Sequence, residues 1–498
     1  MGRTLTNNLG FAFTTEDKDG LPGEDWVALE PNNITSYGAT ITTVARNPIS
    51  QDRQGRKGVI TDLESAVEFE TDLGMSSIQN FIEGFCFAKA VNHDMTFKIA
   101  SCSGTEYTFA DMRTIVASQV PKLKASFLVH ARGFSNSANN GLKSIAVDTA
   151  VASNNIQVAG LIAEASPPAN NELEYAGVCS EDFEIVVANK RATLSTDGDT
   201  IDFTKIGLAM GQFAWIGDPK GSSTFIGGYG RAIAISATEI IMDKLDSALV
   251  TNPNSASDTI CLVLGRFIRN VPVNDDDYIQ RAYQFEAAYK GLGADGATNY
   301  EYSEGNVANS LGFNLPITEK ALLTVGFIGR DTKSPVTPAN RKTGASDAVL
   351  PNKTESFNTS SDVARLRITD LDEAGLTTDF KSLTMTLANG VTPENVLGTL
   401  GAKYLNVANF TVTIEAQLLF TDPKVAEAVR NNTTLTMDFS VKNNDGVIFV
   451  DIPALTLGDG SKDFPVDESI TINTTATAFR DSALGTSLGI STFPFSPK

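Results

Sequence analysis

Residues 410–420 read Phe-Thr-Val-Thr-Ile-Glu-Ala-Gln-Leu-Leu-Phe, so apolar and polar side chains alternate with a period of two. This period predicts a β-strand with one apolar and one polar face. A short amphipathic helix is predicted over residues 423–430, with Pro423 at its first position and Asp422 or Thr421 as its N-cap. The polar face of the strand, which is the candidate water-facing surface, consists of Thr411, Thr413, Glu415 and Gln417.

The same order of strand and helix occurs near the start of the chain. Residues 67–73 alternate in the same way, and residues 76–87 place Ile78, Phe81, Ile82 and Phe85 at helical spacing. Aligning Glu70 with Glu415 gives an offset of 345 residues for the strands, whereas the helices match at 347. The two-residue slip leaves the register weak, but the shared order favours an internal duplication. A duplicated sheet-and-helix unit without catalytic residues indicates a building block of a polymer.

Length and composition indicate a folded protein of several domains. The chain has 498 residues, 42% hydrophobic and 20% charged, for which two to four domains are expected. No apolar run approaches the roughly 20 residues of a membrane helix, and the first eight residues lack the apolar core of a signal peptide. We therefore expect a soluble protein with no export signal and no membrane partner.

The net charge of −20 argues against sequence-specific binding of nucleic acid. Two interpretations remain open. Acidity would let nucleic acid slide past without sticking, or it would merely aid solubility.

No arrangement of residues predicts an enzyme, a cofactor or a metal. The cysteines (Cys86, Cys102, Cys179 and Cys261) are widely spaced, and the only histidines are His93 and His130. We expect buried free thiols and no zinc site. The glycines at 227–230 lack a phosphate-loop context, and the acidic stretches 197–202 and 274–277 lack a complete calcium loop.

A basic loop separates two early strands. Residues 37–44 and 65–73 alternate, and the loop 45–61 between them carries four cations, Arg46, Arg53, Arg56 and Lys57. A connection of this length between paired strands is unusual and tends to bind a neighbour. The alternative is a solvated hairpin end.

The predicted fold class is mainly β, with two sandwich or barrel domains that each carry a flanking helix, plus inserted small all-β modules. The first domain is expected to be discontinuous, over residues 1–110 and 263–345, around an insertion at 111–262 that is rich in short strands and Gly/Asn turns. The second domain is expected over 346–498. Residues 331–361 are polar and aperiodic and predict a linker or long loop.

Eight stretches of the sequence share a family pattern: 29–32, 38–50, 53–58, 61–70, 357–362, 383–389, 397–402 and 410–420. In these stretches the chain resembles the tail tube proteins of long, flexible-tailed bacteriophages. The similarity covers roughly residues 1–110 and 265–498; the inserted modules are less diagnostic.

The resemblance implies a structural virion protein, made in the host cytoplasm, that polymerises into stacked rings around the path of the genome. Two domains per chain imply a trimeric ring with pseudo-sixfold symmetry; without duplication the ring is a hexamer. It also implies that the loop 45–61 reaches the adjacent ring and that the insertion decorates the outside. In such a tube Thr411, Thr413, Glu415 and Gln417 are the candidate lining of the lumen, but a solvated outer face would give the same alternation. The implied partners are further copies of the chain, a tape-measure protein, tail-end proteins and, non-specifically, viral DNA.

Other classes of virion protein remain as alternatives. A surface β protein that binds host glycans, such as an adhesin or tail decoration, is the main one, although Trp26 and Trp215 supply few exposed-aromatic candidates. A sheath or capsid protein is a third.

Overall fold

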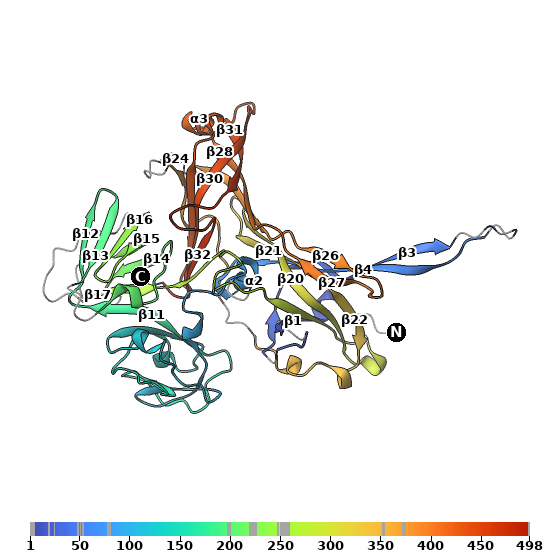
Figure 1. Ribbon diagram of the computed structural model, residues 1–498, viewed down its shortest axis with the longest axis horizontal. Coiled ribbons are helices and arrows are strands. Elements are labelled where there is room, and N and C mark those ends of the chain that lie inside the picture. The colour runs from blue at the N-terminus through green and yellow to red at the C-terminus, as the bar shows by residue number, and fades with distance from the viewer. Residues whose placement is uncertain are drawn as a thin grey trace.

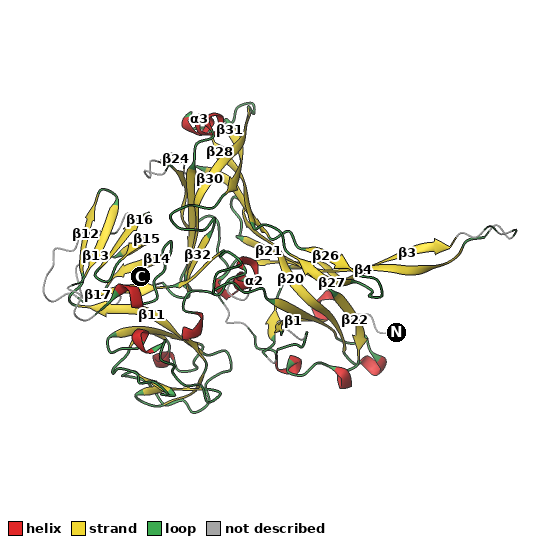
Figure 2. Cartoon of the chain, viewed as in Figure 1, coloured by secondary structure: helices red, strands yellow, loops and turns green. Residues whose placement is uncertain are grey.

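The computed structural model describes residues 5–17, 20–23, 25–46, 49, 51, 54–76, 81–196, 201–218, 227–246, 249, 259–350, 354–370, 375–377 and 379–496. The protein is mainly β, with several sheets and few helices (Figures 1 and 2). A large sheet system forms the centre and right of Figure 1, a second β region lies to its left, and one long hairpin projects to the right.

Seventeen strands belong to the large sheet system. They are β1 (Leu9–Glu16), β2 (Val27–Leu29), β3 (Asn33–Arg46), β4 (Arg56–Asp72), β18 (Arg266–Arg269), β19 (Ala282–Tyr289), β20 (Asn299–Leu315), β21 (Leu322–Gly329), β22 (Asp331–Val336), β23 (Val363–Thr369), β24 (Gly375–Thr377), β25 (Phe380–Ala388), β28 (Thr411–Leu419), β29 (Leu435–Lys442), β30 (Val447–Asp463), β31 (Thr471–Ala478) and β32 (Gly489–Phe493).

Eight of these strands form one uninterrupted antiparallel run, in the order β3–β4–β21–β20–β25–β28–β31–β30. β20 and β30 are each 17 residues long and serve two layers. Their second halves complete the eight-stranded run, while their first halves pair with β19 and β22 and with β29 and β32, respectively. The apolar faces of both layers and the side chains of α2 (Ile82–Cys86) and α3 (Lys424–Asn431) share one core.

One pairing scheme occurs twice in this sheet system. We call β1–β4, α2 and β19–β22 the first unit, and β23–β25, β28–β32 and α3 the second unit. The pairs β1–β2, β1–β19, β19–β20, β20–β21, β20–β22, β3–β4 and β4–β21 recur as β23–β24, β23–β29, β29–β30, β30–β31, β30–β32, β25–β28 and β28–β31. The pair β20–β25 joins the two units.

Individual backbone contacts fix the correspondence between the units. The amide of Leu73 donates to the carbonyl of Ala321 (2.9 Å), and the amide of Phe420 donates to that of Ile470 (3.0 Å). Phe420 lies 347 positions after Leu73, and Ile470 lies 149 positions after Ala321. The strands therefore have the same offset of 347 as the helices. The strand offset of 345 expected from sequence is wrong, and the two-residue slip disappears: Glu415 corresponds to Glu68.

The second β region, which we call the insertion, has a core of its own. Its strands are β5 (Thr96–Phe97), β6 (Ile99–Cys102), β7 (Glu106–Phe109), β8 (Phe127–Arg132), β9 (Gly141–Ser144), β10 (Asn155–Gln157), β11 (Glu172–Ser180), β12 (Glu184–Ala188), β13 (Arg191–Ser195), β14 (Phe213–Gly217), β15 (Gly228–Ile235), β16 (Glu239–Asp243) and β17 (Ile260–Leu264). One core cluster runs from Met95 to Leu264, so the apolar residues between Met95 and Phe109 pack here, upstream of the expected boundary at residue 110. The chain enters and leaves at one place, where Val91 bridges to Phe267.

Two sequence expectations need correction. Residues 331–361 are not a linker: β22 pairs with β20, the short 3-10 helices Pro338–Asn340 and Ala345–Asp347 follow, and Phe357 is fully buried. Cys179 and Cys261 are not free thiols but form a disulfide, because they lie directly opposite each other in β11 and β17, 82 residues apart in sequence. Cys86 and Cys102 are buried and free, as expected.

Both predicted helices have counterparts in the structure, and α3 is shifted by one residue from the expected 423–430. Met75 and Ser76 are helical, residues 77–80, including Ser77 and Ile78, lie outside the described residues, and α2 covers Ile82–Cys86. In α3, Pro423 occupies the N-cap position, while the carboxylate of Asp422 accepts a hydrogen bond from the amide of Lys424 (2.9 Å).

Candidate assembly surface

The eight-stranded run has one apolar and one polar face. On β28, Val412, Ile414 and Leu418 are buried, whereas Thr411, Thr413 and Glu415 are exposed and Gln417 is half-buried. The four candidate residues therefore share one face, as the period of two predicts. Their cross-strand partners are also polar: Glu415 lies between Thr384 and Thr475, and Gln417 between Ser382 and Asn473.

The polar face continues on the first unit and is acidic there. Glu64 and Glu68 on β4 are exposed, and Glu70 is half-buried on the same side of the strand. At the end of β4, burial raises the pKa of Asp72, but hydrogen bonds from Lys320, Asn32 and Ser356 outweigh it and hold the pKa below its usual value. A surface of threonines, amides and carboxylates offers phosphate few attractive contacts.

Both ends of the eight-stranded run are open in the described part of the chain. β3 pairs with β4 alone, and the second half of β30, from Thr456 to Asp463, pairs with β31 alone. Each end therefore presents a row of backbone N–H and C=O groups able to pair with another strand. The two open edges are the strands that a neighbouring molecule would extend.

The turn after β30 is apolar and exposed. It reads Phe464-Pro465-Val466-Asp467-Glu468, and Phe464 and Val466 are 71% and 87% exposed. The equivalent turn after β20 reads Leu315-Pro316-Ile317-Thr318-Glu319. Thr318 and Asp467, at the same place in the two turns, both have a positive φ (57° and 61°).

The projecting hairpin carries the candidate cations. Beyond Gly38 every residue of β3 is exposed, and Arg46 faces Arg56 near the tip, next to exposed Lys57. Arg53 lies outside the described residues. Exposed apolar side chains also line the hairpin: Ile41, Val44, Val59 and Ile60. A two-stranded hairpin is marginally stable alone, which makes this exposed pair of strands a candidate contact surface.

A smaller hairpin braces the base of the projecting one. It consists of β26 (Thr392–Asn395) and β27 (Ala402–Asn406), and the amide of Asn395 donates to the carboxylate of Asp62 on β4 (2.8 Å). In sequence this smaller hairpin connects β25 to β28, just as the tip of the long hairpin connects β3 to β4.

Open sheet edges were expected from the family resemblance, but the sequence did not identify β3, the second half of β30 or Phe464 as the residues that form them. The signal available was the pair of turns, because Leu-Pro-Ile-Thr-Glu and Phe-Pro-Val-Asp-Glu match in residue type and lie 149 residues apart. Which strands pair could not be derived from alternation alone.

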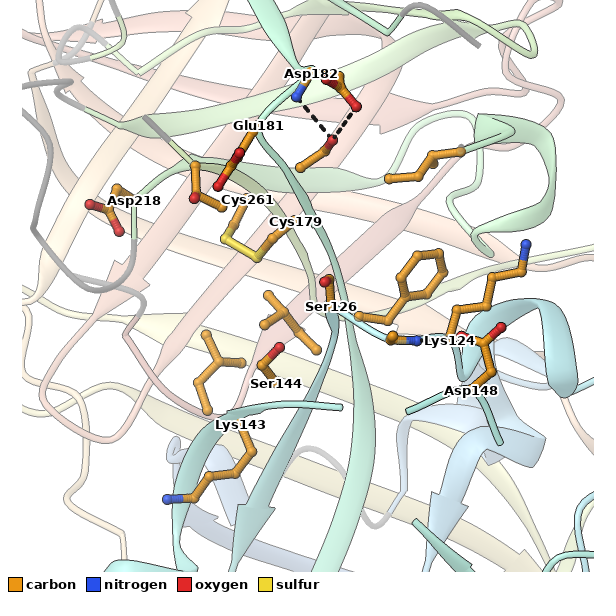
Figure 3. Close-up of a pocket in the computed structure, with 17 residues that line it drawn as sticks. Lys124, Ser126, Lys143, Ser144, Asp148, Cys179, Glu181, Asp182, Asp218 and Cys261 are labelled. Carbon is orange, nitrogen blue, oxygen red and sulfur yellow. Dashed lines mark hydrogen bonds between the residues drawn. A yellow bond between two sulfur atoms is a disulfide. The ribbon is translucent and has the colours of Figure 1, made fainter. Parts of the chain in front are cut away.

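Other features of the chain lie away from this surface. A hollow of about 720 Å³ in the insertion has the Cys179–Cys261 disulfide at its floor, with Ser126, Ser144 and Asp148 on its walls (Figure 3). His93 contacts Glu83 (2.8 Å), and His130 is buried in β8. Within the described residues, no group of three or more His, Cys, Asp or Glu side chains could hold a metal ion. None of the described helices is long and apolar enough to cross a membrane.

Comparison with known families agrees with these observations. A family model described as "Phage tail tube protein" matches residues 8–478, which is nearly the whole chain. The search of curated proteins found no match to the chain.

Proposed function

Because the chain belongs to the phage tail tube protein family, we propose that it polymerises into stacked rings that form the conduit for genome ejection. A structural role in the tube of a virion tail, with self-assembly, follows from the family itself. The number of chains in a ring, the contact between neighbouring chains and the residues that line the lumen are proposed here. The main observation that supports them is the pair of open edges of the eight-stranded run.

Each chain contributes two tube-forming units, so three chains make a ring with pseudo-sixfold symmetry. The repeated pairing scheme supports this count, since every pair within the first unit has a counterpart in the second. The insertion separates the two parts of the first unit, and the second unit follows the first along the chain.

The pair β20–β25 is the internal example of the joint between chains. β20 of the first unit corresponds to β30 of the second, and β25 corresponds to β3. The free second half of β30 then pairs with β3 of the next copy, and closing the ring removes both open edges.

The repeat also gives the register of this joint. Asn314 pairs with Thr384. Asn314 corresponds to Asp463, because Asn314–Leu322 and Asp463–Thr471 are equivalent pairs. Thr384 corresponds to Ser36, because both lie opposite the equivalent residues Glu415 and Glu68. Asp463 of one chain therefore faces Ser36 of the next.

The polar face lines the lumen in this ring, since the opposite face is already buried in the core. Thr411, Thr413, Glu415 and Gln417 then face the bore together with Glu64 and Glu68. Carboxylates repel the phosphates of DNA and let it pass with little adhesion. The basic hairpin with Arg46, Arg56 and Lys57 extends out of the ring and contacts the adjacent one, and Arg53 belongs to the same loop.

The remaining partners follow from the position of a tube in the tail: a tape-measure protein inside it during assembly and tail-end proteins at its termini. Cryo-electron microscopy of the purified protein tests the proposal. We expect hollow tubes in which each ring has three outer lobes and a 24-stranded wall, the product of three chains and the eight strands of each. Isolated monomers at high concentration, or rings of six chains, would contradict it.

A further inference from the structure

The outward face of the first unit's second layer is closed by a short segment of the chain. Residues 338–349 lie over β19 and β20, and Arg341 in this segment forms an ion pair with the buried carboxylate of Glu286 (2.6 Å). Lys342 donates to Gln284 and pairs with Glu304 (2.6 Å). Ala345 packs against Trp26 and Tyr302 in a small core of its own. We call residues 338–349 the first lid.

The corresponding face of the second unit is closed by the insertion. Lys244, just after β16, is 1% exposed and donates to Thr436 on β29 (2.5 Å) and to Asp451 on β30 (2.6 Å). Its ammonium lies 3.4 Å from the carboxylate of Asp438, also on β29. Arg231 on β15 adds a second ion pair to Asp451 (2.8 Å).

Apolar contacts surround these ion pairs. The ring of Phe213 on β14 stacks on Phe449 of β30, with centroids 4.5 Å apart, and Tyr229 packs on Phe449 and Phe493. The amide of Phe213 also donates to the hydroxyl of Ser491 on β32 (3.1 Å). Side chains of the insertion and the second unit therefore form one buried cluster.

The two faces use the same positions. Glu286 lies opposite Tyr302, and Asp438 lies opposite Asp451. Asp438 follows Glu286 by 152 residues, and Asp451 follows Tyr302 by 149 residues. Gln284 and Thr436, two residues before each acid, accept the hydrogen bonds of Lys342 and Lys244. In both units a buried carboxylate and a neighbouring polar side chain on the second layer receive cations from the segment that covers them.

We propose that the insertion is the lid of the second unit, taking the place that residues 338–349 take on the first, and is not an appended decoration. This inference concerns a single chain and holds whether or not the chain forms rings. Asp438 is also held by Arg365 and Arg367 of β23, within the second unit, whereas Asp451 receives its cations, Arg231 and Lys244, from the insertion. A buried carboxylate without its partners is strongly unfavourable, so β30 and its neighbour β29 lose stability through Asp451 whenever the insertion departs. The insertion and the second unit therefore open as one cooperative body, although the insertion has its own core.

The continuous chain alone would not produce this coupling. Entry and exit lie together at Val91 and Phe267, so the backbone offers a single point of attachment. The ion pairs of Lys244 and Arg231 and the stack on Phe449 act away from that point.

Hydrogen exchange on the full-length chain tests the proposal, with Lys244→Met as the variant. We expect amide exchange to rise together in β14–β16 and in β29–β30, by roughly a hundredfold, because Asp451 keeps Arg231 as its only cation and Thr436 loses the hydrogen bond from Lys244. Exchange in β19 and β20 stays unchanged. Arg341→Gln is the matched comparison, and it raises exchange in β19 and residues 338–349 but not in the insertion. Lys205→Gln, at an exposed site of the insertion, changes neither.

The outcomes separate clearly. Faster exchange confined to the insertion, with β29 and β30 as protected as before, would overturn the proposal. If Lys244→Met alone fails to fold, the double variant Lys244→Met/Asp451→Asn decides, because it removes a charge from each side and leaves Arg231 paired with Asp243 and Asp438 paired with Arg365. We expect it to recover part of the protection of β29 and β30, and no recovery would count against the lid.

Discussion

Leu315 and Phe464 occupy the same position in equivalent turns, but Leu315 is 5% exposed and Phe464 is 71% exposed. Leu315 is covered because its strand pairs with β25 of the second unit, where it lies opposite Leu383. Phe464 has no such neighbour within the chain as described. In the proposed ring, β3 of the next copy of the chain would cover Phe464 as β25 covers Leu315.

Replacing Phe464 by aspartate should abolish ring formation and leave the monomer folded. Burying a phenylalanine contributes about 1.5–3 kcal/mol, and the variant loses this at every joint while adding a charge to an apolar contact. Sedimentation velocity and negative-stain microscopy measure assembly, and the thermal midpoint of the monomer measures folding.

The equivalent change Leu315→Asp is the contrasting case, since its side chain is buried inside the chain. It should lower the free energy of unfolding by roughly 3–5 kcal/mol. Met112→Asp, at a fully exposed apolar site of the insertion, controls for added charge. Normal rings from Phe464→Asp would show that this turn takes no part in assembly.

Reversing the charge of side chains that line the proposed bore should slow the passage of DNA through the tube without preventing assembly. The double variant Glu68→Lys/Glu415→Lys changes two exposed side chains on equivalent strands, so tubes should still form. Cationic bores should retain double-stranded DNA in a salt-dependent manner, and genome ejection should be slower. Glu181→Lys/Glu184→Lys on the insertion is the matched control. Equal DNA retention by both variants would place Glu68 and Glu415 outside the bore.

Removing the cations of the projecting hairpin should separate ring formation from stacking. In the triple variant Arg46→Ser/Arg56→Ser/Lys57→Ser the joint between chains is untouched, so rings should accumulate in place of tubes. Microscopy counts rings against tubes, and the exposed Arg191→Ser on the insertion controls for lost charge. Tubes of normal length would assign stacking to other residues.

Acid should weaken the contact between the insertion and the C-terminal segment through His130. Burial, assisted by the charge of Arg132, lowers the pKa of His130 to about 3, and its ring stacks on Phe495. The unfolded chain binds a proton near the ordinary pKa of 6.5, whereas the folded chain does not until about pH 3.

Stability therefore falls as the pH drops from about 6.5 towards 3, by at most about 1.4 kcal/mol per pH unit from this group. In His130→Leu the free energy of unfolding should depend less on pH across that window. Chemical denaturation at several pH values measures both proteins, and parallel pH profiles would rule out His130 as the cause.

Alternation in sequence was enough to predict individual strands, but not which strands pair. The strand at residues 410–420 and its polar face were predicted correctly, because a period of two fixes which side chains share a face. The units could not be aligned correctly, since any two alternating strands match at offsets of 345 or 347; the Leu73–Ala321 and Phe420–Ile470 hydrogen bonds decide it.

Contacts between residues far apart in sequence explain the features that could not be predicted from the sequence. Residues 338–349 lack the period of a strand because they form only short 3-10 turns, and the ion pairs of Arg341 and Lys342 hold them on a distant sheet. Cys179 and Cys261 become neighbours only when β11 pairs with β17. Phe464 looked like an ordinary turn residue until its counterpart Leu315 was found buried.

Disulfide trapping across the proposed joint tests the central claim most directly. In the variant Ser36→Cys/Asp463→Cys, oxidation should link β30 of one chain to β3 of the next, and non-reducing electrophoresis should show dimers and trimers and nothing larger. The pair Thr40→Cys/Asp463→Cys, displaced by four residues or about 13 Å along β3, should not cross-link. A ladder that continues to six chains, or no cross-link at all in assembled tubes, would contradict the three-chain ring closed by β30 and β3.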